Sequence, residues 1–145
     1  IRNSSPMMQV SVEVKTHQLD AYVRNLGMIE VILDKAANDI AGRAQRSIKM
    51  RQSRHMKYKR GKRGRRVHWS SAPGYPPNSD TGKLVGSIKA KPIKPTEYYV
   101  VANAKYAIPL EIGTRRMAAR PFMLPAVNQV KGSFILAIQS VLKGR

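Results

Sequence analysis

Residues 28–50 read MIEVILDKAANDIAGRAQRSIKM, and their pattern sets the architecture of the chain. The apolar side chains recur at spacings of three and four residues, which is the repeat of one face of an α-helix. They are Ile29, Ile32, Leu33, Ala36, Ile40, Ala44 and Ile48. Small alanines within this stretch allow a second element to pack closely against it. We therefore predict one long amphipathic helix with a single apolar stripe.

Before this helix, residues 8–15 alternate between apolar and polar side chains, which is typical of a half-buried strand. A short helix is expected at about 17–26, ending near Gly27. The chain opens with Ile1, whereas two methionines directly precede the patterned strand. We expect residues 1–7 to be a disordered or non-native leader and residues 8–145 to form a single domain.

After the helix, residues 51–79 show no sustained period. Three prolines and a glycine between positions 73 and 77 oppose regular structure there. We therefore predict an extended loop, basic in its first half and proline-rich in its second. A loop of this length in a compact domain is usually functional or disordered.

The segment that follows the loop predicts a short helix, capped by Ser79 or Asp80, and then two strands at 88–94 and 98–103. Pro92 lacks an amide donor, so the first of these strands is expected at the edge of the sheet.

The C-terminal part predicts a helical turn at 106–112 that ends at Gly113, and a last helix that begins at Pro121. The apolar face of the last helix is expected to contain Leu124, Val127, Phe134, Ile138 and Val141. The whole order predicts an α+β fold, in which a small, mainly antiparallel sheet packs against two longer helices.

Charge is distributed unevenly along the chain. Lysine and arginine number 27 against 8 aspartate and glutamate, which gives a formal net charge of +19. Nine of the sixteen residues from 51 to 66 are basic and none is acidic. The nine are Arg51, Arg54, Lys57, Lys59, Arg60, Lys62, Arg63, Arg65 and Arg66. Like-charge repulsion should keep this run mobile until a partner neutralises it, and either nucleic acid or an acidic protein neighbour fits that role. The third interpretation is a charge run that is merely solvated.

Residue types that carry catalysis or bind cofactors do not cluster in the sequence. The chain has no cysteine, and its three histidines lack a second histidine or a carboxylate at metal-ligand spacing. The eight carboxylates nominate no pair for acid–base work, and neither a Gly-x-Ser-x-Gly elbow nor a phosphate-binding glycine loop is present. We expect a non-enzymatic protein with no cofactor, no metal and no membrane contact.

Three segments in the second half carry a recurring pattern. The first joins Ala72-Pro73-Gly74-Tyr75-Pro76-Pro77 to Asp80-Thr81-Gly82-Lys83-Leu84, the second joins Tyr106-Ala107 to Leu110-Glu111-Ile112-Gly113-Thr114, and the third is Ala119-Arg120-Pro121-Phe122-Met123. In this order they resemble the tailed-phage family of minor tail components that includes tail completion proteins. The resemblance covers about residues 72–127 and leaves the basic run outside the family pattern.

The resemblance implies a structural virion protein of a bacteriophage, a tail completion or neck subunit active in head-tail joining. It implies a homo-oligomeric ring, expected to be a hexamer, with tail tube, tail terminator or head-tail connector proteins as neighbours. Contact with genomic DNA stays open. The protein is then expected in the virion tail or neck, after assembly in the host cytoplasm. The alternative from another class is a small basic nucleic-acid-binding protein.

The motif residues also have physical interpretations of their own. Gly82 and Gly113 fit tight backbone positions, and Glu111 with Arg120 is expected to form an ion pair, either within the subunit or between subunits. The residues that either shape the fold or form an interface are Asp80, Gly82, Glu111, Gly113, Thr114, Arg120, Pro121 and Phe122. The strand at 88–94 and the loop at 111–120 are expected to contribute to ring contacts.

Overall fold

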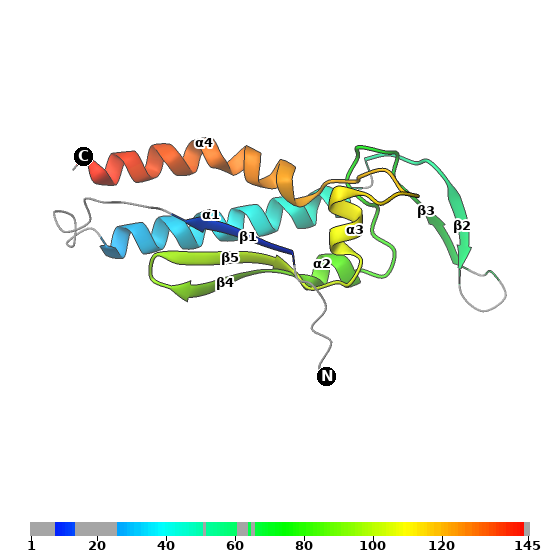
Figure 1. Cartoon of the computed structure of the whole chain (residues 1–145), viewed down its shortest axis with the longest axis horizontal. Coiled ribbons are helices and arrows are strands. Elements are labelled where there is room, and N and C mark those ends of the chain that lie inside the picture. The colour runs from blue at the N-terminus through cyan, green and yellow to red at the C-terminus, as the bar shows by residue number, and fades with distance from the viewer. Residues whose placement is uncertain (1–7, 14–25, 51, 61–63, 65, 144–145) are drawn as a thin grey trace.

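The computed structural model describes residues 8–13, 26–50, 52–60, 64 and 66–143. Within them the elements run β1 (Met8–Glu13), α1 (Leu26–Lys49), β2 (Lys57–Arg60), β3 (Arg66–Trp69), α2 (Lys83–Ser87), β4 (Ile88–Lys94), β5 (Glu97–Ala102), α3 (Ala107–Ile112) and α4 (Met123–Leu142). The molecule is elongated, with α1 and α4 side by side along one sheet and the β2–β3 hairpin projecting at one end (Figure 1). The fold is α+β, as predicted.

The main sheet is antiparallel and has the order β1-β5-β4. Ala102 of the central strand lies opposite Met8 on one side and opposite Ile88 on the other. β4 is an edge strand, as Pro92 predicts, and its register shifts between Pro92 and Lys94. The irregularity follows from the missing amide donor of proline.

Helix α1 organises the core, because it packs against β4 and β5 and also along α4. Its predicted apolar stripe is buried except at Ile32, which is partly buried; Ile29, Leu33, Ile40 and Ile48 are at most 3% exposed. Truncating such a side chain, for example Leu33→Ala, typically costs about 2–5 kcal/mol because a cavity remains.

The last helix differs from the prediction in both its start and its buried face. It begins at Met123 with Phe122 as the N-cap residue, so Pro121 precedes the helix. The buried positions of α4 are Met123, Ala126, Val130, Ile138 and Val141. Leu124, predicted on the buried face, is 59% exposed. A side chain from α3 caps the first turn, and the spacing of apolar residues gives no sign of that contact.

The prediction that residues 51–79 contain no regular structure is wrong at two short strands. β2 and β3 form a second antiparallel sheet, with Lys57 opposite Trp69 and Lys59 opposite Val67. Aromatic and β-branched side chains alternate there with polar and basic ones, which favours strands. Each strand has only four residues, too few to establish a period in the sequence.

Two smaller elements test further predictions. α2 has Gly82 as its N-cap residue with no side-chain cap, so the predicted cap by Ser79 or Asp80 is wrong. α3 ends at Gly113, as predicted. The leader at 1–7 and nearly all of the short helix expected at 17–26 lie outside the described residues. None of the described helices is both long enough and apolar enough to span a membrane.

Candidate functional site: a motif junction and a basic arm

The motif segments meet at the carboxylate of Glu111, near the end of α3. One oxygen accepts hydrogen bonds from the backbone N–H groups of Phe122 at 2.9 Å and Met123 at 3.0 Å, and the other accepts from Leu124 at 2.8 Å. The N-terminus of a helix exposes such unpaired donors, and its dipole favours a negative charge there. The Glu111–Arg120 ion pair predicted within the subunit is wrong, because this carboxylate caps α4 instead. The pair between subunits stays a prediction.

Gly113 occupies a position that excludes other residues. Its φ is +79°, and a Cβ at this position would lie 2.8 Å from the backbone N of Ala119 and 2.9 Å from the carbonyl O of Met117. The predicted tight position is confirmed here. Gly82 also has a positive φ of +76°, but a Cβ there would meet nothing within 4 Å. Glycine is therefore favoured at position 82 by the backbone conformation alone, and no neighbouring atom would clash with a side chain there.

Arg120 joins the segments through its backbone. Its N–H donates to the carbonyl of Leu110 at 2.7 Å, and the preceding carbonyl, of Ala119, accepts from the N–H of Gly74 at 2.9 Å. The Arg120 Nε is buried without a hydrogen-bond partner among the described residues. Phe122 is 1% exposed. The proline-rich loop, the Glu-x-Gly-Thr loop and the Arg-Pro-Phe segment are thus tied into one motif junction.

The motif residues differ in how far they reach the surface. Glu111, Gly113, Arg120, Pro121 and Phe122 are wholly or partly buried in the junction, whereas Asp80, Gly82 and Thr114 are exposed. The Thr114 N–H donates to the Met117 carbonyl at 2.8 Å, which closes a short turn. Arg115 and Arg116 stand exposed at the tip of this turn.

Beside the junction, the β2–β3 hairpin and its flanks form a basic arm, defined as residues 53–72 where described. The N–H of His55 donates to the Ser70 carbonyl at 2.8 Å, and the N–H of Ser70 donates to the Met56 carbonyl at 2.9 Å. Asn78 then clamps the base, because its Nδ2 donates to the carbonyls of Ser53 at 2.7 Å and Trp69 at 2.9 Å. The arm is therefore held by the proline-rich loop of the junction.

The structure places the nine predicted basic residues unequally. Arg54, Lys57 and Lys59 are exposed on the arm. Arg60, the last residue of β2, pairs with Arg66, the first residue of β3. Arg51, Lys62, Arg63 and Arg65 lie outside the described residues.

One face of the arm combines cations with apolar side chains. Lys57, Lys59, Val67 and Trp69 share this face, because residues paired across strands point to the same side. The Arg54 Cζ lies 5.9 Å and the Lys57 Nζ 5.8 Å from the centroid of the Trp69 ring, within cation–π range. We call this surface the Trp69 face.

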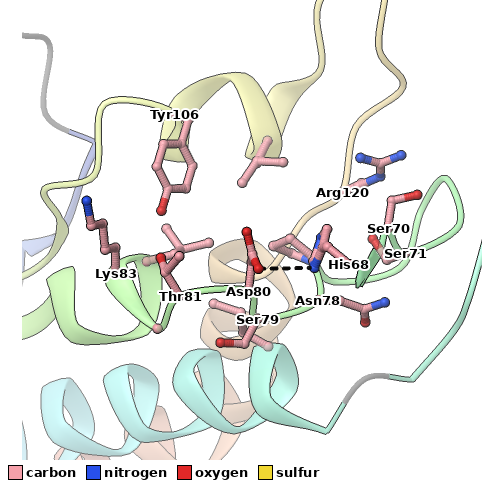
Figure 2. A pocket seen from close by; sticks show the side chains of 15 residues that line it. His68, Ser70, Ser71, Asn78, Ser79, Asp80, Thr81, Lys83, Tyr106 and Arg120 are labelled. Carbon is pink, nitrogen blue, oxygen red and sulfur yellow. Dashed lines mark ion pairs between the residues drawn. The ribbon is translucent and has the colours of Figure 1, made fainter. Parts of the chain in front are cut away.

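A cleft of about 440 Å³ lies where the base of the arm meets α2 and α3 (Figure 2). His68 enters it from β3, Asp80 from the segment that leads to α2, and Tyr106 from the start of α3, with its hydroxyl directed toward Thr81. The His68 Nδ1 lies 3.9 Å from the Asp80 Oδ1, which is longer than a hydrogen bond.

Two hydroxyl groups of the cleft form hydrogen bonds with the backbone. Ser70 Oγ accepts from the Met56 N–H at 3.1 Å, and Ser71 Oγ donates to the Tyr75 carbonyl at 3.4 Å. In the described part of the chain, no group of three or more His, Asp or Glu side chains is placed to hold a metal ion.

Comparison of the chain with protein-family models, with curated proteins and with solved structures found no match. The sequence had drawn attention to the basic run and to the motif residues. It gave no sign of the Asn78 clamp, since a single asparagine in a proline-rich loop is an ordinary turn residue.

Proposed function

We propose that the chain is a structural subunit of a tailed-phage particle, a tail completion or neck ring component that acts through its interfaces. The observation that carries the proposal is the motif junction. The segments of the resembling pattern, far apart in the sequence, are joined by the Glu111 cap, the tight Gly113 position and the Arg120–Leu110 backbone bond. Motif residues that hold the fold together are expected in a protein that acts by presenting surfaces to its neighbours in an assembly.

A closed ring of identical subunits needs two different faces on each subunit. The β4 edge carries exposed Lys89, Lys91 and Lys94 and is interrupted by Pro92, features that oppose addition of another strand. We therefore expect β4 to contact a neighbour through its side chains. The second expected surface, the loop at 111–120, presents the arginine pair at its tip.

The second candidate function is nucleic-acid binding, which the net charge of +19 and the basic hairpin favour. A two-stranded ribbon fits the major groove of duplex DNA, and lysine and arginine gain affinity by releasing counterions. Size-exclusion chromatography with light scattering separates the two candidates. Ring-sized oligomers in the absence of DNA favour the assembly role, whereas monomers that bind duplex DNA tightly favour the second.

The proposed function is tested by a nonsense mutation in the gene, placed in the phage genome that encodes the chain. Electron microscopy should then show heads and tails that fail to join, and the chain supplied from a plasmid should restore joined particles. A synonymous change at the same codon is the control. Normal, infectious particles from the nonsense mutant would refute the structural role.

A further inference from the structure

The basic arm exposes apolar side chains on both of its faces. Val67 and Trp69, 51% and 38% exposed, lie on the Trp69 face, whereas Tyr58, 42% exposed, pairs with His68 on the other face and bonds to Met56, 50% exposed. On the Trp69 face two large apolar groups thus stand in water among the cations of the arm, and exposed apolar surface of this kind marks interaction sites. The composition of the arm therefore needs a partner that takes up both charge and apolar surface.

Phosphate binding accounts for only part of this composition. Non-specific affinity for DNA comes from cations alone, and apolar side chains add nothing to it. Stacking on bases would use the Trp69 ring, but Arg54 and Lys57 already lie over that ring. Protein interfaces, by contrast, place an apolar centre inside a polar rim and are enriched in tryptophan, tyrosine and arginine. The Trp69 face combines Val67 and Trp69 with Arg54, Lys57 and Lys59, which are side chains of these two kinds.

A hollow beside the Trp69 face gives the partner a place to insert a side chain. It measures about 310 Å³ and is lined by Arg54, Val67, His68, Trp69 and residues 78–80. Its wall combines the apolar side chains of Val67 and Trp69 and the Arg54 guanidinium with polar groups, among them the Asp80 carboxylate beside His68. An apolar group whose neighbouring carboxylate lies toward Arg54 matches this lining.

A second copy of this chain does not supply the partner surface. The chain has 8 carboxylates against 27 lysines and arginines. Several of the described carboxylates are already engaged. Glu111 caps α4, Glu97 accepts from the Tyr99 hydroxyl at 2.9 Å, and Asp34 accepts from Asn38 at 3.1 Å. Asp80 lies 3.9 Å from His68. At the Trp69 face a second copy would place mainly positive charge against Arg54, Lys57 and Lys59, so the partner of this face is a different, acidic molecule.

We propose that the Trp69 face binds an acidic segment of a different protein, in which at least one apolar side chain stands between carboxylates. The apolar side chain enters the hollow beside Trp69, and the carboxylates meet Arg54, Lys57 and Lys59. The inference deepens the proposed function, because a neighbour in the particle is the expected source of the segment. Its test uses the isolated full-length chain, so the result does not depend on whether particles contain the chain.

Trp69 is the only tryptophan of the chain, so its fluorescence reports directly on this face. The probes are a synthetic peptide of alternating glutamate and leucine, an equally charged peptide of glutamate and serine, and a short duplex DNA, all at physiological ionic strength. The leucine peptide should bind about tenfold or more tightly than the serine peptide, because burial of one leucine is favourable by at least that factor. It should also shift the Trp69 emission to shorter wavelengths.

Val67→Thr keeps the shape and the β-branching of the side chain but adds a hydroxyl, and it should remove most of the preference for the leucine peptide. The matched control is Ile93→Thr, at a similarly exposed apolar position on β4, which should retain the preference. Equal affinities of the parent chain for the two peptides, or no binding of either, would overturn the proposal. Tight, steeply salt-dependent binding of duplex DNA together with equal peptide affinities would identify nucleic acid as the partner instead.

Discussion

The backbone N–H of Phe122 donates a hydrogen bond of 2.9 Å to the carboxylate of Glu111. The same carboxylate takes the next two N–H groups, of Met123 and Leu124, and the residue after them, Pro125, has no N–H. Of the four backbone nitrogens at the start of α4, three thus donate to one side chain and the fourth belongs to a proline, which has no hydrogen to donate. Glu111 therefore fixes where the last helix begins and joins two motif segments through charge-assisted bonds.

Glu111→Ala should lower the free energy of unfolding by roughly 1.5–3 kcal/mol, because charge-assisted bonds are lost and buried donors lose their acceptor. Glu111→Gln keeps one acceptor oxygen and should cost less. Glu30→Ala, at an exposed position on α1, is the control. Urea denaturation measures the differences, and a Glu111→Ala variant as stable as the parent would show that the cap contributes nothing. Because the cap contributes to stability, a head-tail joining defect in a Glu111→Lys variant would reflect loss of folding stability as well as loss of any subunit interface.

Gly113→Ala and Gly82→Ala form a matched pair, since both glycines have φ near +80°. Gly82→Ala should cost about 1 kcal/mol, because only the backbone conformation opposes the new methyl group. Gly113→Ala should cost clearly more, because its Cβ also meets backbone atoms at 2.8 and 2.9 Å. Thermal denaturation compares the two variants. Equal losses of stability would mean that the loop at 117–119 moves away without cost.

Asn78→Ala should loosen the base of the arm and leave the helical core intact. It removes two hydrogen bonds, to Ser53 and Trp69, so amide exchange in the arm should rise about tenfold, while exchange in α1 stays unchanged. Asn128→Ala, at an exposed site on α4, is the control. Hydrogen exchange followed by mass spectrometry resolves the two regions, and unchanged exchange in residues 53–60 and 66–72 would show that the arm is held by other contacts.

Burial, together with the Asp34 and Glu30 carboxylates, raises the pKa of the Tyr98 phenol above its ordinary value of 10.0. The folded protein therefore holds this proton more tightly than the unfolded chain. Above about pH 10 the unfolded state loses the proton first, so the free energy of unfolding should fall as the pH rises further. Tyr98→Phe should show a shallower fall in urea denaturation at alkaline pH, and Tyr106→Phe, at an exposed tyrosine, should not. Identical pH profiles for the parent and Tyr98→Phe would contradict the shift.

The features that the sequence predicts are those determined by neighbouring residues. The stripe from Ile29 to Ile48 predicts α1, Pro92 predicts the edge strand, and Gly113 predicts a tight turn. The contact of Glu111 with α4 was not predictable in this way, since a carboxylate eleven residues before Phe122 fits an ion pair with Arg120 equally well. Which group the Glu111 carboxylate binds depends on the unpaired donors that the folded chain brings close to it.

The two strands of the basic arm were not predictable from the sequence for a related reason. Tyr58, Val67 and Trp69 favour strands, but each strand is short and lies within a dense run of like charge, which favours an unstructured loop. The base of the hairpin is bonded to Asn78, a residue outside both strands. Local propensity contains no information on such a tertiary contact.

The central claim, that the chain is a structural part of a tailed-phage particle, is tested most directly by quantitative mass spectrometry of purified particles from the phage whose genome encodes it. We predict peptides of the chain at a low copy number in a constant ratio to the major tail tube protein, and retention of the chain after nuclease treatment and washing with salt. Absence of the chain from intact, purified particles would contradict the claim.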